Sequence, residues 1–389
     1  GTGLWRFYAL FDAFACTVEV APFMNNAGVY WIAVELTTLV STFLVGYERA
    51  AESMEAAWKY IIVVSAGISL ALLGTILLYW CGSFVLGPTY DMTWGVLREA
   101  APKLNPLLLD ISFLLLLVGY GTKAGLAPMH TWLPDAHSEG PAPVSAMLSG
   151  ALLNTAMVGI VRALAITDRA AMPLYLPRAV LVVLGALSLL VGALFIVRQR
   201  GVKRLMAYSS VEHMGVVALG FGFGGSLGIA GALYHMLNHS LNKSLMFFGA
   251  GNVMRAFGSK DMGAIRRVRL QFPVMGTLWL AGAVAITGAP PFGPFLSELT
   301  VLRAGMESIH VWAAVVMLIL LVVIFIGFLE HFRAMYFSKP AETPLKFTRL
   351  SVWCVLPMWL ALLPLLVLGL WWPDVLHRLF SAIAKVLAP

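Results

Sequence analysis

The chain has 389 residues, of which 60% are hydrophobic and 12% are charged, and its mean hydropathy is +0.86. Soluble domains carry about 25% charged residues. The composition therefore excludes a disordered chain, a nucleic-acid-binding domain and an ordinary cytosolic enzyme, and it is typical of an all-α polytopic membrane protein. Lys and Arg in cytoplasmic loops explain the net charge of +7.

The three cysteines lie far apart and form no C-x-x-C motif; they are Cys16, Cys81 and Cys354. This spacing excludes an iron–sulfur site built by this chain alone and argues against a disulfide framework. We therefore expect no cofactor on this chain. Because the sequence starts without an initiator Met, we also expect residues to be missing before it.

In chain order, long apolar stretches predict eleven membrane spans, most of which reach the roughly 20 residues needed to cross hydrocarbon. Their approximate limits are 5–25, 28–47, 57–82, 106–129, 142–167, 174–198, 203–223, 226–255, 271–303, 309–337 and 350–372. Between the third and fourth spans, residues 84–104 are predicted to form a loop with a short interfacial helix.

The fourth and ninth spans are interrupted near residues 121–128 and 288–294, where Gly and Pro cluster. Proline removes a backbone donor and clashes with the preceding turn, so both helices should break. Paired broken helices are typical of transporters with inverted repeats. We predict two inverted five-helix repeats, 1–167 and 168–340, each with one discontinuous helix, followed by a C-terminal helix and tail at 341–389.

The loop charges predict the orientation of the chain in the membrane. One set of loops carries Arg49, Lys59, Arg198, Arg200, Lys203, Arg204, Arg255, Lys260, Arg266, Arg267, Arg269, Arg333, Lys339, Lys346 and Arg349, whereas the other carries Arg98, Lys103, Arg169, Arg178, Arg303, Arg378 and Lys385. The richer set should face the cytoplasm, which places the C-terminus outside.

Ionisable residues at membrane depth are costly, so each is a functional candidate. The candidates for proton translocation are Glu35, Lys123, His235, His239, Lys243 and Glu298. The two histidines and Lys243 recur at i, i+4 and i+8, so they lie on one helix face. Acids, bases and imidazoles in one bilayer layer favour a proton relay, because each group gains or loses a proton as its neighbour's charge changes.

Each candidate also has a structural alternative. Glu35 could be the static partner of a buried Arg, and Lys123 could extend to an interface. The two histidines could belong to a purely structural polar face or bind a metal, although Met236 stands where the zinc-protease pattern has Glu.

Glu298 could cap the half-helix after the second break. Two further acidic residues, Asp12 and Glu19, share a face of the first span, where helix packing, an interface or a role in conduction would each explain them.

Five segments together carry a family resemblance: Trp31–Leu36, Gly121–His137, Lys203–Ser210, His235–Lys243 and Gly288–Glu298. In this order they resemble the proton-pumping, antiporter-like membrane subunits of respiratory complex I, over about residues 5–340. Within that family, the segments Ala207–Gly215 and His235–Lys243 look most like the hydrogenase-4 type, specifically its F-type membrane component.

The resemblance implies a non-catalytic, proton-translocating subunit of a complex I-like or nickel–iron hydrogenase respiratory complex. Its partners would be other membrane subunits, a peripheral hydrogenase or electron-transfer module, and the lipid bilayer. Iron–sulfur and nickel–iron centres would lie on partner subunits, and the location would be the bacterial or archaeal cytoplasmic membrane. Family members usually have fourteen helices, so the eleven here correspond to helices four to fourteen.

In the mechanism that the resemblance implies, Glu35 and Lys123 form a switchable ion pair, and Lys243 and the histidines pass protons towards Glu298. Further relay candidates are His130, His137, Asn154 and His213. Family pumps often have Lys or His in the middle of the helix after the first break, where this chain has the stretch from Ser149 to Asn154. The amide of Asn154 does not ionise, so water or a hydroxyl group would have to carry the proton between the neighbouring ionisable residues.

Three functions remain open on the sequence. The first is the hydrogenase-linked pump, which the intact ionisable residues favour. The second is a NADH–quinone oxidoreductase pump or a sodium/proton antiporter subunit. The third is a weakly conducting coupling scaffold of the inorganic-carbon-uptake type, which Asn154 favours.

Overall fold

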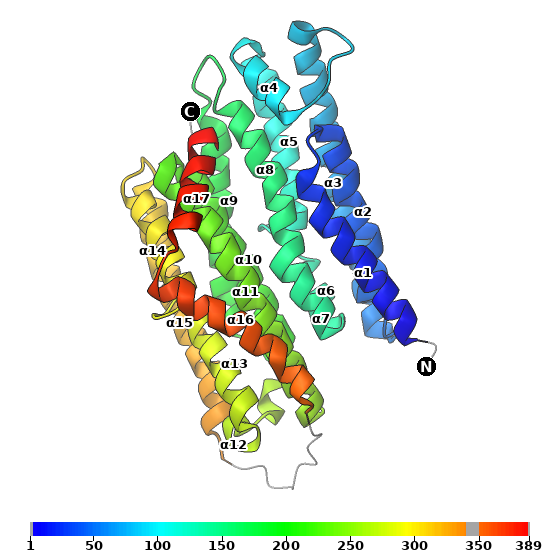
Figure 1. Ribbon diagram of the computed structural model, residues 1–389, viewed down its shortest axis with the longest axis vertical. Coiled ribbons are helices and arrows are strands. Elements are labelled where there is room, and N and C mark those ends of the chain that lie inside the picture. The colour runs from blue at the N-terminus through cyan, green and yellow to red at the C-terminus, as the bar shows by residue number, and fades with distance from the viewer. Residues whose placement is uncertain (1–2, 340–349, 388–389) are drawn as a thin grey trace.

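The computed structural model describes residues 3–339 and 350–387, which form helices joined by short loops, with no strand within those ranges (Figure 1). All eleven predicted spans fall on helices, which confirms the all-α membrane class. They are α1 (Leu4–Val20), α2 (Ala27–Val45), α3 (Ala51–Leu86), α5 (Pro106–Ala124), α7 to α8 (Ala142–Met147 and Leu153–Thr167), α9 (Tyr175–Ile196), α10 (Val202–Phe223), α11 (Gly225–Phe257), α13 with α14 (Pro273–Ile286 and Gly293–Met306), α15 (Val311–Phe337) and α16 (Val352–Leu370).

Seven of these helical segments in the described ranges are individually long and apolar enough to cross a membrane. The other four predicted spans rest on α1, α10, α11 and the α13–α14 pair. Helices α10 and α11 have the length but carry several polar residues, and α10 is buried along nearly its whole length. A helix surrounded by other helices can hold polar groups at membrane depth because they face protein instead of lipid.

Asparagine caps fix where two of the spans begin. The Asn26 side chain accepts hydrogen bonds from the backbone N–H groups of Gly28 and Val29, at 2.9 and 3.2 Å, at the start of α2. The Asn105 side chain does the same for the first turn of α5, where Pro106 follows it. Both caps satisfy donors that the first helical turn leaves unpaired.

Both predicted helix breaks are confirmed. Helix α5 ends at Ala124, Gly125 takes φ 77° in the left-handed region, and the chain becomes helical again at α6 (Leu133–Glu139). The exposed backbone is satisfied by protein: the Trp132 indole donates to the Thr122 carbonyl at 2.8 Å, and the Ala127 N–H donates to the Ser188 hydroxyl at 2.9 Å. Non-helical backbone at membrane depth requires such partners.

The second break separates α13 from α14, and Gly288 within it takes φ 64°. A short π-helical segment, η3 (Leu148–Leu152), joins α7 to α8. The predicted interfacial helix is α4 (Trp94–Ala100). The remaining short helices are η1 (Ala21–Phe23), η2 (Ala101–Lys103), η4 (Met262–Ala264) and α12 (Val268–Gln271).

The predicted C-terminal tail contains a further helix, α17 (Asp374–Leu387). Figure 1 shows α16 running obliquely across α11 and α13, with α17 turning back beside α11. Tyr234 of α11 fixes this junction, because its hydroxyl donates to the Leu368 carbonyl and its ring stacks on Trp372 at 4.4 Å. Residues 340–349 of the predicted second repeat and C-terminal region lie outside the described residues.

Candidate functional site

A hydroxyl joins the first predicted pair of charges. Lys123 is fully buried in the last turn of α5, where its amine donates to the Thr38 hydroxyl of α2. The Thr38 hydroxyl in turn donates to the Glu35 carboxylate at 3.2 Å, and the Ser65 hydroxyl of α3 donates to its other oxygen at 2.9 Å. Lys123 therefore points into the protein, and the alternative that it extends to an interface is wrong.

Lys243 of α11 is also fully buried and has a similar environment. Its amine donates to the Ser209 hydroxyl at 2.7 Å and to the Met206 carbonyl at 3.1 Å, both on α10. Glu212, one turn further along α10, is the carboxylate whose charge acts on Lys243. The Ser209 hydroxyl also interacts with the carboxylate of Glu212, which lies one helical turn further along α10.

Two imidazoles form the centre of the site. Nδ1 of His213 and Nε2 of His235 lie 2.9 Å apart, at hydrogen-bond distance. On one side, Nδ1 of His235 lies 2.9 Å from the Ser297 hydroxyl of α14. On the other, Nε2 of His213 lies 3.5 Å from the Glu212 carboxylate. Each neutral imidazole donates at one nitrogen and accepts at the other, so this chain can pass a proton from ring to ring.

Glu298 lies beside this chain. Its Oε1 atom is 3.9 Å from Nδ1 of His213 and has no hydrogen-bond partner, and the residue is 6% exposed. Helix α14 starts after Phe292 with no side-chain cap, so the capping alternative for Glu298 is wrong. Its carboxylate instead fills the second break, where a Cβ on Gly288 would lie 1.9 Å from it.

Two buried histidines have unpartnered ring nitrogens. His239 lies 5.5 Å, ring to ring, from His213, and both of its nitrogens lack a protein hydrogen bond. His137 of α6 is in the same situation, between the Trp132 and Phe247 rings. Buried polar atoms rarely remain unpaired, so ordered water is the expected partner at both positions. His130, half-buried in the first break, lies apart, near the Tyr208 ring.

Asn154 contacts a different side of α11. Its amide donates to the Ser240 hydroxyl at 2.9 Å, to the Met236 carbonyl at 3.1 Å and to the Gly150 carbonyl at 3.2 Å. The contacts with Ser240 and Met236 hold α8 against α11, beside a cavity of about 400 Å³ that Asn154 helps to line. The geometry therefore gives Asn154 a packing contact between helices rather than a contact with any of the candidate relay side chains.

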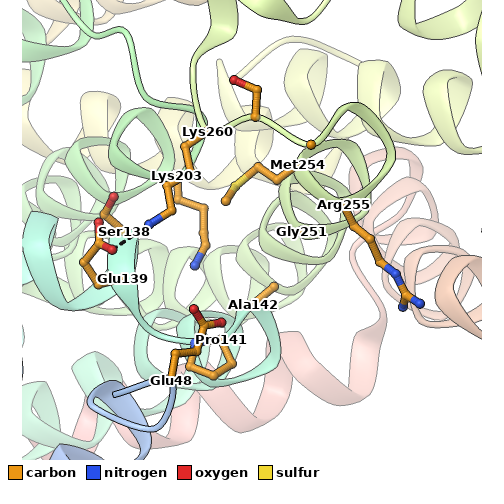
Figure 2. A pocket seen from close by; sticks show the side chains of 12 residues that line it. Glu48, Ser138, Glu139, Pro141, Ala142, Lys203, Gly251, Met254, Arg255 and Lys260 are labelled. Carbon is orange, nitrogen blue, oxygen red and sulfur yellow. Dashed lines mark hydrogen bonds and ion pairs between the residues drawn. The ribbon is translucent and has the colours of Figure 1, made fainter. Parts of the chain in front are cut away.

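A second cavity, of about 330 Å³, opens where the end of α6, the start of α10 and the end of α11 meet (Figure 2). The buried Lys203 amine donates to the Gly140 carbonyl at its edge, and Lys260 pairs with Glu139 at 2.7 Å. His137 precedes the lining residues of α6 and interacts electrostatically with both Lys203 and Lys243. The cavity is thus lined by Ser138, the residue that follows the buried His137 in α6.

The metal alternative from the sequence pairs His235 with His239. The structure instead groups His235 with His213 and Glu298, whose ligand atoms all lie within 4.8 Å of one another. A cation there would have to break the hydrogen bond that the two imidazoles share, so the arrangement favours proton exchange.

Sequence reasoning missed the bridging groups Thr38, Ser65, Ser209, Glu212 and Ser297. One signal was available: Thr38 and Ser209 each lie three residues from an acidic residue, which puts them on one helix face. Asp12 and Glu19 are exposed on α1, so they do not belong to the buried group of ionisable residues.

Residues 25–325 match a family of transmembrane proteins described as NADH:quinone oxidoreductase/Mrp antiporter. The chain is 40% identical over 312 residues to the hydrogenase-4 component F homolog of Methylacidiphilum infernorum, covering 79% of this chain and 65% of that protein. It is 31% identical to hydrogenase-4 component B of Escherichia coli, covering 74% of this chain and 43% of that one. The chain thus spans less than two thirds of the length of these relatives.

Solved structures share the fold. A chain of respiratory complex I from Thermus thermophilus matches with a TM-score of 0.84 and 23% identity, covering 99% of this chain and 80% of that one. A chain of the Mrp complex from Dietzia matches with a TM-score of 0.85 and 19% identity, covering 97% and 76%.

Proposed function

Because the chain belongs to the NADH:quinone oxidoreductase/Mrp antiporter transmembrane family, we propose that it is the proton-translocating membrane subunit of a hydrogenase-type respiratory complex. Its relatives include subunits named for hydrogenase-4 and for formate hydrogenlyase. Partner membrane subunits and a peripheral module with nickel–iron and iron–sulfur centres would accompany it in a bacterial or archaeal cytoplasmic membrane. The basic loops would face the cytoplasm.

The observation that carries this proposal is the buried imidazole chain from Glu212 through His213 and His235 to Ser297. Titratable groups at membrane depth are expensive, and a row of them joined by hydrogen bonds is typical of a proton path. Water at His137 and His239 would connect this chain with the cavity beside Lys203.

The driving force must come from outside the chain. Moving one proton against the membrane potential costs about 2.3 kcal/mol per 100 mV. Electron transfer on partner subunits would displace the helices around the breaks and change the distance between Glu35 and Lys123. A lysine that loses its carboxylate partner in a buried site releases its proton more readily.

The test uses the native complex purified through a tag on this chain. Mass spectrometry should identify a hydrogenase large subunit among the partners. In inverted membrane vesicles, hydrogen turnover should acidify the interior, and replacing sodium by choline should leave the acidification unchanged. A complex that turns over hydrogen without moving protons would contradict the proposal. Acidification that requires sodium would favour the antiporter alternative instead.

The scaffold alternative draws on the packing contact of Asn154. It predicts that the chain co-purifies with a soluble partner and that substitutions of Lys123 and Lys243 leave the activity of the complex unchanged.

A further inference from the structure

The buried amine of Lys243 has no carboxylate within 4.0 Å in the described part of the chain, and its two contacts are with Ser209 and a backbone carbonyl. A fully buried ammonium without a nearby counter-charge is costly. Glu212 is the acid that acts on it electrostatically, and this acid is itself 1% exposed with an unpartnered Oε2 atom. Neither group is explained by helix packing alone.

The arrangement repeats the chemistry found at Lys123. There, a threonine hydroxyl accepts from the lysine and donates to Glu35, three residues away on α2. At Lys243, the Ser209 hydroxyl accepts from the lysine and interacts with Glu212, three residues away on α10. The hydroxyl residue follows the acid on α2 and precedes it on α10, but both sites combine a carboxylate, a hydroxyl group and a lysine.

We propose that Glu212 carries protons in this path and forms, with Lys243 and the bridging Ser209, a second carboxylate–lysine switch. This inference rests on the proposed function and adds to it a residue and a step. The charge of Glu212 acts on Glu298 as well as on Lys243, so a change in the protonation of Glu212 affects both of these residues.

In each step one proton moves, and one bond to hydrogen breaks as another forms. The Lys243 ammonium gives a proton to the Ser209 oxygen as the serine gives its own proton to Glu212, so an N–H bond breaks and a carboxyl O–H bond forms. The pair is neutral overall before and after this step, so it avoids the cost of creating net charge in a buried site.

The carboxyl proton of Glu212 then has an acceptor, Nε2 of His213, at 3.5 Å. His213 passes its other ring proton to His235 across their 2.9 Å contact. Close packing fixes the acid in this position, because a Cβ on Gly192 of α9 would lie 2.6 Å from the Glu212 Cβ.

The experiment compares five variants of the purified complex, one of them Lys243→Ala, in inverted vesicles with hydrogen as the electron donor, and measures protons moved per hydrogen turned over. Glu212→Gln should lower this ratio at least about tenfold, since it keeps the shape but cannot carry a proton. Ser209→Ala, which removes the bridge, should lower it several-fold, and Ser209→Thr should restore it. Ser244→Ala is the matched control, because Ser244 is next to Lys243 but bonds only the Ser240 carbonyl.

The outcomes separate the two proposals. If the unsubstituted complex moves no protons, the proposed function fails. If Lys243→Ala abolishes translocation while Glu212→Gln and Ser209→Ala keep the normal ratio, the proposed function stands and the second switch is overturned. If Glu212→Gln does not assemble, Ser209→Ala still tests the switch, because a normal ratio without the bridging hydroxyl would overturn it.

Discussion

Nδ1 of His213 and Nε2 of His235 lie 2.9 Å apart, which joins α10 and α11 by a direct contact between two imidazoles. Only one of these two nitrogens donates the hydrogen bond, so the tautomer of one imidazole depends on the tautomer of the other. His235 extends the chain to Ser297 on α14. The central helices are therefore connected by groups that can each accept and release a proton.

Replacing His235 by Gln should interrupt this chain. Gln can still form hydrogen bonds, but it cannot receive a proton at one atom and release one from another. We expect proton translocation to fall at least about tenfold with the complex still assembled. Vesicle acidification measured together with hydrogen turnover checks this. His377→Gln, at an exposed position on α17, is the control and should behave as the unsubstituted chain.

Replacing Lys123 by Ala should largely abolish proton translocation. Lys123→Arg should fail too, because a guanidinium keeps its proton at any accessible pH and does not fit the single Thr38 contact. The same acidification assay applies, with the exposed Lys103→Ala as a control. Normal pumping by Lys123→Ala would remove this residue from the path.

Glu298→Gln should slow or uncouple proton movement without unfolding the protein. The amide keeps the shape that fills the break at Gly288 but cannot ionise. Glu307→Gln, just beyond the end of α14, should leave both hydrogen turnover and acidification unchanged. If Glu298→Gln also left both unchanged, Glu298 would be a packing residue.

Asn154→Lys should reduce assembly instead of improving pumping. The amide of Asn154 donates to Met236 and Ser240 of α11, and a lysine there would lose that geometry and place a charge among helices. Native gels of the complex give the measurement, with Met172→Lys in an exposed loop as the control. An assembled variant with increased pumping would show instead that a basic group at this position can join the path.

Asp168→Ala should destabilise the protein. The Asp168 carboxylate is nearly buried and pairs with two nitrogens of Arg178, at 2.5 and 3.0 Å, where α8 turns into α9. Removing it leaves a partly buried guanidinium without its partner, which costs roughly 3 kcal/mol. Thermal unfolding in detergent should show a lower midpoint, whereas Glu307→Ala, which breaks an exposed pair with Arg303, should not change it.

Local features of the sequence determined the helices and both breaks. A run of apolar residues forms its hydrogen bonds within its own segment, and the prolines near 128 and 290 remove donors at fixed positions. The same reasoning selected Lys123, the histidines of α11 and Glu298, because an ionisable residue in an apolar stretch is conspicuous on the sequence alone. The helix α17 was missed, as an amphipathic helix does not stand out by hydropathy.

The tertiary structure decided which of these groups touch. Lys123 and Thr38 are 85 residues apart, and their contact depends on how α5 packs on α2. Glu212 and Ser209 looked like ordinary residues of a helical motif until the packing of α10 against α11 placed Lys243 beside them. Asn154 interrupts the pattern of ionisable residues on the sequence, and the structure shows that it joins α8 to α11 through the Met236 carbonyl and the Ser240 hydroxyl. Helix periodicity assigns a side chain to a face, but the partner on that face depends on crossing angles and rotamers, which only the packed helices determine.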